Sequence, residues 1–317
     1  MSTGATDLPS PSAGRRIRVL WNPHSGRKAG IPTNSVSKED LQDLMVRFGL
    51  GDELIATQSE EEAIASARDA VANGYDVVVA AGGDGSIGLV ATELLGTDTA
   101  LGILPLGSIM NIPRMLDVPR ELDGAAGVLR DGHVRRIDVG ASDGRIFFEA
   151  ATVGFHAAIF REMPKVDEGD YGAIVRSMIA AFRYRPSRMT IELEDGREID
   201  TRALVLVVAN GRFMGAGFTV APEALVDDGL FDVRIFRHYS KWELIRHFTS
   251  IAFGRRAYAP HVATERAAHV RVESARPLPV RADAVDLGTT PVGFDIRAGT
   301  LLVVAPAPSA AEAEPPA

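Results

Sequence analysis

Residues 76–86 read Asp-Val-Val-Val-Ala-Ala-Gly-Gly-Asp-Gly-Ser, and this stretch decides the fold. Residues 76–81 are almost all apolar, which is typical of a strand buried on both faces in a parallel sheet. Gly82 to Ser86 then turn into a helix that we expect at 87–95. Glycines let backbone amides approach a polyphosphate, and the N-terminus of a helix adds partial positive charge. The stretch therefore predicts a phosphate-binding turn at the end of a buried strand.

Asp84 lies in the middle of this turn. Its carboxylate is placed to hold magnesium or to orient a proton. An Asx turn that only joins strand to helix is an equally good interpretation of a lone Gly-Gly-Asp-Gly. The functional interpretation therefore depends on the neighbouring loops.

The alternation of strand and helix extends on both sides of this stretch. Ser37 and Ser59 each precede an acidic residue at the spacing of a helix cap, and apolar residues at helical spacing follow. The alternation predicts an α/β N-terminal doubly wound nucleotide-binding domain, in which ligands bind at the carboxyl ends of the strands. The strands expected in this domain are 15–21, 54–57, 76–81 and 100–104.

Two more loops leave strand ends in this domain. Asn22 to Lys28 contains Gly26 and two cations, and Leu104 to Asn111 offers the hydroxyl of Ser108 and the amide of Asn111. A helix cap is a slightly better interpretation of Ser108 when that loop is taken alone. Three loops at strand ends of one sheet are expected to converge on one crevice, and this convergence favours a binding site.

The second half of the chain has a different rhythm. After about Asp138 strands follow one another with hairpin signals such as Asp195-Gly196, which predicts a C-terminal mainly antiparallel β domain. Its expected strands include 146–151, 198–203 and 204–209, and its expected helices are 171–182 and 241–253. Leu301–Ala305 is an apolar strand that either closes this domain or returns to the first. The expected division is a disordered tail at 1–14, a nucleotide-binding domain at 15–138 with a possible return strand at 300–306, a β-rich lipid or substrate domain at 139–299, and a disordered tail at 307–317.

Composition excludes several classes of protein. The chain has 317 residues and a net charge of −8, which argues against binding to nucleic acid or to an acidic membrane through overall charge. It has no cysteine, which excludes disulfides and thiol catalysis and fits a reducing cytoplasm. Neither a secretory signal nor a transmembrane segment is evident. We expect a cytoplasmic protein that contacts membranes peripherally through a local patch, and a homodimer is possible.

Six motifs in register carry a resemblance to a known family. They are NPHSG, GGDGS, LPLGSIMN, VGF near Gly154, NGRFMGAG from Asn210 and APEALVDDGLFDV from Ala221. Together they resemble the diacylglycerol kinase catalytic-domain family, which includes bacterial lipid kinases and sphingosine kinases. The resemblance implies a nucleotide domain, a β-rich domain and a cleft between them. It also implies Mg²⁺-dependent transfer of the γ-phosphate of ATP to the hydroxyl of diacylglycerol or a related lipid alcohol.

The resemblance also assigns residues. Where the family usually has threonine, this chain has Ser86 and Ser108, which keep the hydroxyl. Asp228 resembles a position that helps to hold a structural magnesium ion in bacterial members, and a plain Asp-Gly turn is the alternative. The residues expected at the nucleotide are Asn22, Ser25, Gly26, Thr57, Gly82, Gly83, Asp84, Gly85, Ser86, Ser108 and Asn111.

One position departs from the family pattern. Family members carry Asp-Gly-Glu before the final strands, and the Glu is understood to assist deprotonation of the lipid hydroxyl. Here the sequence is Asp283-Ala284-Val285-Asp286, which places valine where that Glu belongs. Loss of a general base costs about 10² to 10⁴ in rate. Asp84 and Asp286 are the alternative catalytic residues, although neighbours in a strand point to opposite faces, so Asp286 needs a loop conformation.

Three functions therefore stay open. The first is an active lipid kinase, and the second is a catalytically impaired regulatory protein that binds nucleotide or lipid. The third is a kinase of a soluble substrate, because GGDG also occurs in NAD kinases, although their adjacent Asn-Asn-Glu or Asn-Asp signature is missing. A basic cluster of Arg183, Arg185 and Arg188 with Tyr184 contacts lipid phosphates or is simply a solvated face.

Overall fold

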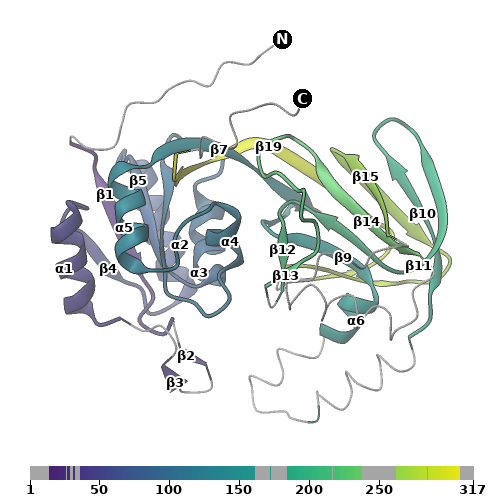
Figure 1. Ribbon diagram of the computed structural model, residues 1–317, viewed down its shortest axis with the longest axis horizontal. Helices are drawn as coiled ribbons and strands as arrows, with labels where there is room; N and C mark the ends of the chain where they lie inside the picture. The colour runs from purple at the N-terminus through teal and green to yellow at the C-terminus, as the bar shows by residue number, and fades with distance from the viewer. Residues whose placement is uncertain are drawn as a thin grey trace. The chain divides into compact units, whose positions relative to one another are not determined.

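The computed structural model of the chain divides into two compact units, Met1–Ile137 with Thr300–Ala317 and Asp138–Gly299 (Figure 1). The residues that it describes are 14–25, 27–28, 31–32, 36–160, 172, 184–215, 217–237, 262–283 and 285–307. The helices expected at 171–182 and 241–253 lie outside this set apart from Gly172, as do most of the two expected tails.

A parallel sheet forms the centre of the first unit, in the order β19-β6-β5-β1-β4. Every residue of β5 and β6 is buried, as the continuous apolar sequence predicts. The last strand pairs with β6 at Val303 and Leu101, so the apolar segment 301–305 returns to the first unit. The strands are β1 (Ile17–Trp21), β4 (Leu54–Ala56), β5 (Val77–Gly82), β6 (Ala100–Pro105) and β19 (Val292–Ala305).

Helices cover this sheet in two groups, because α1 contacts α5 and α2 contacts α3 (Figure 1). Ser37 and Ser59 cap α1 and α2 and accept hydrogen bonds from the backbone N–H of Asp40 and Glu62. The third helix begins earlier than expected, with Asp84 as its first residue. The helices are α1 (Lys38–Phe48), α2 (Glu60–Ala72), α3 (Asp84–Glu93), α4 (Asn111–Met115) and α5 (Leu122–Asp131), and the short strands β2 (Arg27–Lys28) and β3 (Ile31–Pro32) pair with each other.

Strands of the second unit pair antiparallel, in the order β18-β17-β9-β11-β10-β16, and β14 pairs with β11 and β15. This arrangement confirms the predicted fold class. The elements are β7 (His133–Ser142), β8 (Arg145–Phe147), β9 (Ala150–Gly154), α6 (Phe155–Phe160), β10 (Ser187–Leu193), β11 (Glu198–Ala209), β12 (Phe213–Met214), β13 (Phe218–Thr219), β14 (Phe231–Arg237), β15 (Val262–Ala267), β16 (His269–Ser274), β17 (Pro279–Ala282) and β18 (Val285–Thr289).

The structure corrects two strand predictions in this unit. The single strand expected at 146–151 is interrupted between β8 and β9. The interruption has a clear cause, because the Asp283 carboxylate accepts the backbone N–H groups of Phe148, Glu149 and Ala150. Conversely, 198–203 and 204–209 form one strand, β11, whose register against β14 shifts between Ala203 and Val205.

Two hydrophobic clusters cover opposite faces of the second unit's central strands. Ala151 and Val153 of β9 belong to the first cluster, in which the rings of Phe147 and Phe231 stack with centroids 5.7 Å apart. Ala150 of the same strand belongs to the second cluster. Because side chains alternate along a strand, Thr152 shares the face of Ala150. A polar residue thus lies on the second face, beside an apolar core.

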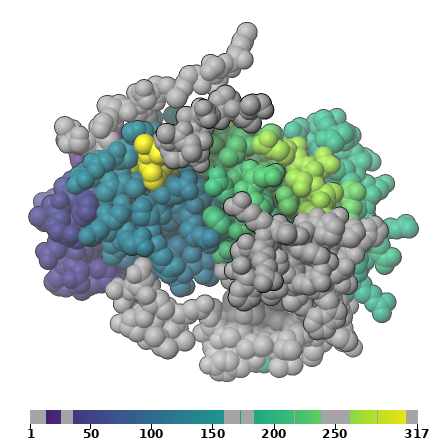
Figure 2. All heavy atoms as spheres, in the orientation of Figure 1, coloured from purple at the N-terminus to yellow at the C-terminus, as the bar shows by residue number. Residues whose placement is uncertain are grey.

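The last part of β19 is integral to the first unit. Leu301 to Ala305 are all buried, and Figure 2 shows the yellow atoms of the last described residues set among teal atoms of that unit. Next to them the carbonyl of Thr300 accepts a hydrogen bond from the backbone N–H of Gly96. The first unit is therefore built from two separate stretches of sequence.

Candidate active site

The loop after β1 is tied to the start of α3. The Asn22 side-chain amide donates a hydrogen bond of 3.0 Å to the Ser86 hydroxyl, and the Asn22 backbone N–H donates to the Ala81 carbonyl. A side chain on Gly82 would lie 2.6 Å from Ser86 Cβ, so only glycine fits there. The first two predicted loops are therefore in direct contact.

The loops after β5 and β6 abut each other just as closely. A Cβ atom on Gly107 would lie 2.8 Å from Gly83 Cα, and the Leu106 N–H donates to the Gly82 carbonyl. A Cβ atom built on Gly83 would point toward Gly107 and lie 3.5 Å from its Cα atom. These contacts bring all three strand-end loops together within the first unit, as the sequence predicts.

Asp84 joins two of these loops. Its Oδ2 accepts the backbone N–H of Asn111 at 3.1 Å, and its Oδ1 accepts that of Ile112 at 2.9 Å. The carboxylate thus caps the N-terminus of α4, where orphan N–H groups and partial positive charge favour an anion. This structural role was not predicted, and the role of Asp84 toward magnesium or a proton stays a prediction.

A pocket of about 340 Å³ opens beside these loops, at the carboxyl ends of β1, β4 and β5. Apolar side chains line it together with polar residues from the strand ends and from the start of α2, and such a mixture is typical of small-molecule sites. A Cβ atom on Gly85 would meet no heavy atom within 4 Å. The part of the pocket wall that the start of α2 contributes was not predicted from the sequence. The pocket is lined by Leu20, Asn22, His24, Thr57, Gln58, Ser59, Glu60, Ala63, Ala80, Gly85, Ser86, Leu89 and Val90.

The structure does not bring every predicted nucleotide residue to this pocket. Ser108 is exposed, and its carbonyl accepts a hydrogen bond from Arg120. Asn111 is fully buried. Ser25 lies near the second loop, with Oγ 3.3 Å from a Cβ built on Gly82. Gly26 lies outside the described residues. The thirteen-residue lining therefore includes Asn22, Thr57, Gly85 and Ser86 of the predicted set.

In the second unit, the altered motif forms a hairpin between β17 and β18. Val285 pairs with Ala282, whose side chain belongs to the first cluster, and Val285 is 44% exposed. Asp286 pairs with Arg281, so it points to the opposite face. The loop conformation that would bring Asp286 to the position of the missing Glu is absent here, because both residues lie in β18. The Asp286 carboxylate instead accepts the N–H of Gly288 at 2.8 Å.

Two polar contacts next to β9 were not predicted from the sequence. The Glu149 carboxylate accepts the backbone N–H of Gly215 at 3.1 Å. His156 Nδ1 lies 3.2 Å from the Thr152 hydroxyl, and burial, with a smaller contribution from Arg281, lowers the pKa of His156 to about 4. Its imidazole is therefore neutral at pH 7. A signal existed in the sequence, namely a Glu between apolar residues next to VGF.

Asp228, the predicted magnesium ligand, is engaged in other contacts. One carboxylate oxygen pairs with Arg266, and the other accepts the N–H of Leu230. Nearby, Asp138 accepts the N–H groups of Gly229 and Gly299, and burial raises the pKa of its carboxyl. No cluster of three or more metal-binding side chains occurs among the residues that the structure describes. A magnesium ion at Asp228 would have to replace Arg266, so that assignment stays a prediction.

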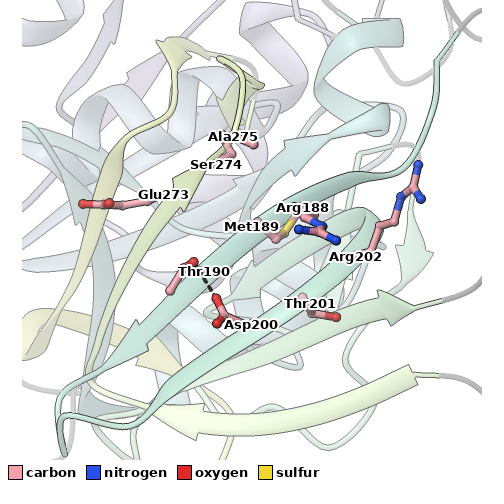
Figure 3. A pocket seen from close by; sticks show the side chains of 9 residues that line it. All are labelled: Arg188, Met189, Thr190, Asp200, Thr201, Arg202, Glu273, Ser274 and Ala275. Carbon is pink, nitrogen blue, oxygen red and sulfur yellow. Dashed lines mark hydrogen bonds between the residues drawn. The ribbon is translucent and has the colours of Figure 1, made fainter.

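A second pocket, of about 580 Å³, lies over β10, β11 and β16 (Figure 3). Arg188 and Arg202 face each other across the β10–β11 ladder, and the Thr190 hydroxyl donates to Asp200 beside them. Acidic and basic side chains both line the pocket, which is typical of a solvated sheet face. Tyr184, which the sequence analysis grouped with Arg183, Arg185 and Arg188, packs edge-on against Phe155, and burial raises the pKa of its hydroxyl to about 12.

Comparisons with known proteins agree with the two units. The family model described as "Diacylglycerol kinase catalytic domain" matches residues 16–142, and the one described as "YegS C-terminal NAD kinase beta sandwich-like domain" matches residues 150–305. The chain belongs to the diacylglycerol kinase catalytic-domain family. It is 26% identical over 288 residues to a diacylglycerol kinase of Staphylococcus aureus strain JH9, covering 88% of this chain and 89% of the relative.

A solved structure shares the fold. The crystal structure of a diacylglycerol kinase from Bacillus anthracis strain Sterne matches with a TM-score of 0.69 at 17% identity, covering 94% of this chain and 98% of that one. Membership of this family makes the chain a kinase that uses ATP, and such kinases typically require a divalent metal ion. Among the described residues, no helix is long and apolar enough to span a membrane.

Proposed function

We propose that the protein transfers the γ-phosphate of ATP to the hydroxyl of diacylglycerol or a related lipid alcohol, with Mg²⁺, in the cytoplasm at a membrane surface. The observation that carries this proposal is the convergence of the three strand-end loops of the first unit beside the 340 Å³ pocket. The lipid acceptor is inferred from the relatives, which are named diacylglycerol kinases.

The first unit has the groups that hold a polyphosphate. The N-terminus of α3 presents backbone amides and partial positive charge next to Gly85, where no atom blocks the approach of an oxygen. The Asn22 amide and the Ser86 hydroxyl are already oriented toward each other. Phosphoryl transfer depends chiefly on positioning and on charge stabilisation, which rigid loops of this kind provide.

The hydroxyl, amide and backbone N–H groups of the first unit's loops can form hydrogen bonds with the nucleotide. No acidic cluster among the described residues forms a site for free Mg²⁺. Mg²⁺ commonly binds through substrate phosphates and retained waters, with only one or two carboxylates. The residues of the first unit therefore fit an ion that arrives on the nucleotide. When bound, the ion neutralises charge on the phosphate oxygens.

The test is a phosphotransfer assay with labelled ATP, Mg²⁺ and a panel of lipid alcohols, with NAD as a soluble acceptor. Label in a lipid product is expected, and its absence for every lipid despite measurable ATP binding would contradict the proposal. Label in NAD alone would indicate a kinase of a soluble substrate.

A regulatory, catalytically impaired protein is the second candidate, and Val285 favours it. A valine side chain cannot accept a proton. Val285 is 44% exposed, so the position where the family has Glu carries no charged group in this chain. Retained ATP binding without transfer to any acceptor is the expected result for this candidate.

A further inference from the structure

Four arginines lie close together in the second unit. Arg202 Nε donates a hydrogen bond of 3.3 Å to the Pro186 carbonyl. The Arg276 guanidinium donates one of 3.0 Å to the Arg185 carbonyl. Both side chains thus reach the segment that leads into β10, in which Arg188 is the second residue. We call this group the arginine cluster; its members are Arg185, Arg188, Arg202 and Arg276, whereas Arg183 of the predicted basic cluster lies outside the described residues.

The charges of the arginine cluster are not balanced within the part of the chain that the structure describes. In the turn after β10, Arg197 forms an ion pair with Asp195. On β16, Arg271 forms one with Glu273. By contrast, no Asp or Glu of the described ranges forms an ion pair with a member of the arginine cluster. A guanidinium stays protonated in a protein, so four positive charges remain together on a chain whose net charge is −8.

Two members of the cluster are direct neighbours. Arg188 and Arg202 are partners in the antiparallel β10–β11 ladder, and both are exposed. Like charges at opposite positions of two strands destabilise a sheet. Among the described residues, the Arg188 guanidinium has no hydrogen-bond partner, and that of Arg202 has the Pro186 carbonyl alone. The pair therefore costs stability, and an anion bound between the two guanidinium groups would remove that cost.

This pair of arginines lies at one end of the 580 Å³ pocket (Figure 3). The two acidic residues in the pocket wall already have partners. Asp200 accepts a hydrogen bond of 2.7 Å from the Thr190 hydroxyl, and Glu273 accepts one of 3.0 Å from Arg271. A guanidinium has five N–H donors, so both arginines of the pair keep donors for a ligand. The pocket thus offers a concave site with two positive charges at one end.

A phosphate group is the ligand that fits this end of the pocket. Guanidinium groups bind phosphate oxygens through paired N–H donors. One dissolved phosphate ion would engage the pair but would leave the other two arginines of the cluster unused. A membrane that contains acidic phospholipids presents many phosphates side by side. Clusters of about four to eight Lys or Arg residues at a membrane surface are typical of binding to such lipids.

We propose that the arginine cluster docks the second unit on acidic phospholipids, with the phosphate of one headgroup held between Arg188 and Arg202. This proposal rests on the proposed function, in which a membrane supplies the lipid alcohol. Because the chain has a net charge of −8, overall charge repels an acidic membrane, and a local patch has to provide the attraction. A sheet face that is merely solvated predicts no preference among lipids and no difference among its arginines.

The experiment measures co-sedimentation of the full chain, without nucleotide, with two kinds of vesicle. One contains phosphatidylcholine mixed with phosphatidylglycerol, and the other contains phosphatidylcholine alone. We expect binding to the mixed vesicles only, and weaker binding as salt is added. Arg188→Gln and Arg202→Gln should each weaken the binding about fivefold, because each removes one positive charge at the membrane surface. Arg197→Gln is the matched control, since it makes the same charge change outside the pocket wall.

Asp200→Asn provides a test in the opposite direction. This substitution removes a negative charge from the pocket wall and keeps an oxygen that accepts the Thr190 hydroxyl. Binding to the mixed vesicles should become stronger, by about threefold. A variant that has lost its fold would not show such a gain. Melting temperatures are measured for every variant, and Arg188→Gln should not lower the melting temperature, because it removes a contact between like charges.

Equal binding to both kinds of vesicle, or an equal loss of binding in Arg197→Gln and Arg188→Gln, would overturn the proposal. An Asp200→Asn protein that binds the mixed vesicles more weakly than the wild type would do the same. A wild type that phosphorylates lipid in micelles but does not bind the mixed vesicles overturns the docking proposal and leaves the proposed function intact. A wild type that docks through these arginines but phosphorylates no lipid alcohol supports the docking proposal and refutes the proposed function.

Discussion

The GGDG loop of the first unit and the Asp283–Asp286 hairpin of the second are both family motifs, but each retains a different part of the family pattern. In the first, the glycines and Asp84 are present, Ser86 keeps the hydroxyl of the family's threonine, and the loop contacts both of its neighbours. In the second, Asp283 still organises the backbone through three hydrogen bonds, while Val285 provides no chemistry. The residues of a motif that build a turn are therefore separable from those that react.

The largest effect is expected from Asp84→Asn. Asparagine offers one acceptor oxygen where the structure uses two, so the link between the second and third loops weakens. We expect the free energy of unfolding to fall by about 2–3 kcal/mol and ATP affinity to fall by about 100-fold. Thermal melting and ATP titration measure both, with the exposed Asp98→Asn as the charge-matched control. Lost magnesium-dependent ATP binding at unchanged stability would mean that Asp84 acts on the metal and not as a cap.

Next in size is Gly85→Val, which tests the first unit alone. The new side chain projects into open space at the pocket and should weaken ATP binding by about 10-fold to 100-fold, the usual penalty of overfilling a site. Stability should hardly change. Gly127→Val is the control, because it adds the same side chain to α5 at a position where a Cβ meets only Phe48, at 3.9 Å. Equal ATP affinity in both variants would show that nucleotide does not occupy this pocket.

Val285→Glu tests the other side of the comparison. Position 285 is exposed enough to accept the change with little cost in stability. If the general base is missing, we expect turnover to rise about tenfold, because a carboxylate at this position can accept the proton of the acceptor hydroxyl. No gain, or a loss of turnover, would indicate that another group already accepts the proton, because two carboxylates placed together repel each other.

The smallest effect concerns Asp228 and magnesium. Asp228→Asn removes a partly exposed ion pair and should cost about 0.5 kcal/mol. If Mg²⁺ binds here, Arg266→Ala should increase the stabilisation by added Mg²⁺ to about 1 kcal/mol, and Asp228→Asn should abolish it. Melting temperatures with Mg²⁺ and with a chelator measure this. No Mg²⁺ effect in Arg266→Ala would remove Asp228 from the list of metal ligands.

Local patterns predicted the first unit well. Ser37 and Ser59 cap the predicted helices, and β5 and β6 are buried as their apolar runs indicate. The convergence of three loops also followed from strand order alone. Predictions failed where a distant side chain decides local structure. The break at residues 148–149 depends on Asp283, more than a hundred residues away, and no local pattern records that contact.

The same limit applies to the candidate site. Asp84 was expected to face a ligand, because its sequence neighbours are glycines, but Asn111 and Ile112 were not known to lie beside it. Glu149 was overlooked because a single acidic residue in an apolar run of sequence has no periodicity. Only the structure shows that its carboxylate meets Gly215 from another motif. The parts of the site that were not predicted are those that depend on hydrogen bonds between residues far apart in the sequence.

The return of β19 to the first unit has a consequence for synthesis of the protein. β6 pairs with Val303, and Gly96 bonds to Thr300, so the first unit lacks an edge strand until almost the whole chain has left the ribosome. During that time the buried strand β6 exposes unpaired backbone groups, which invite association with other chains. The sheet of the first unit is thus completed only when β19 has been synthesised. A chain that ends near residue 290 is therefore expected to aggregate, because its first unit lacks this strand.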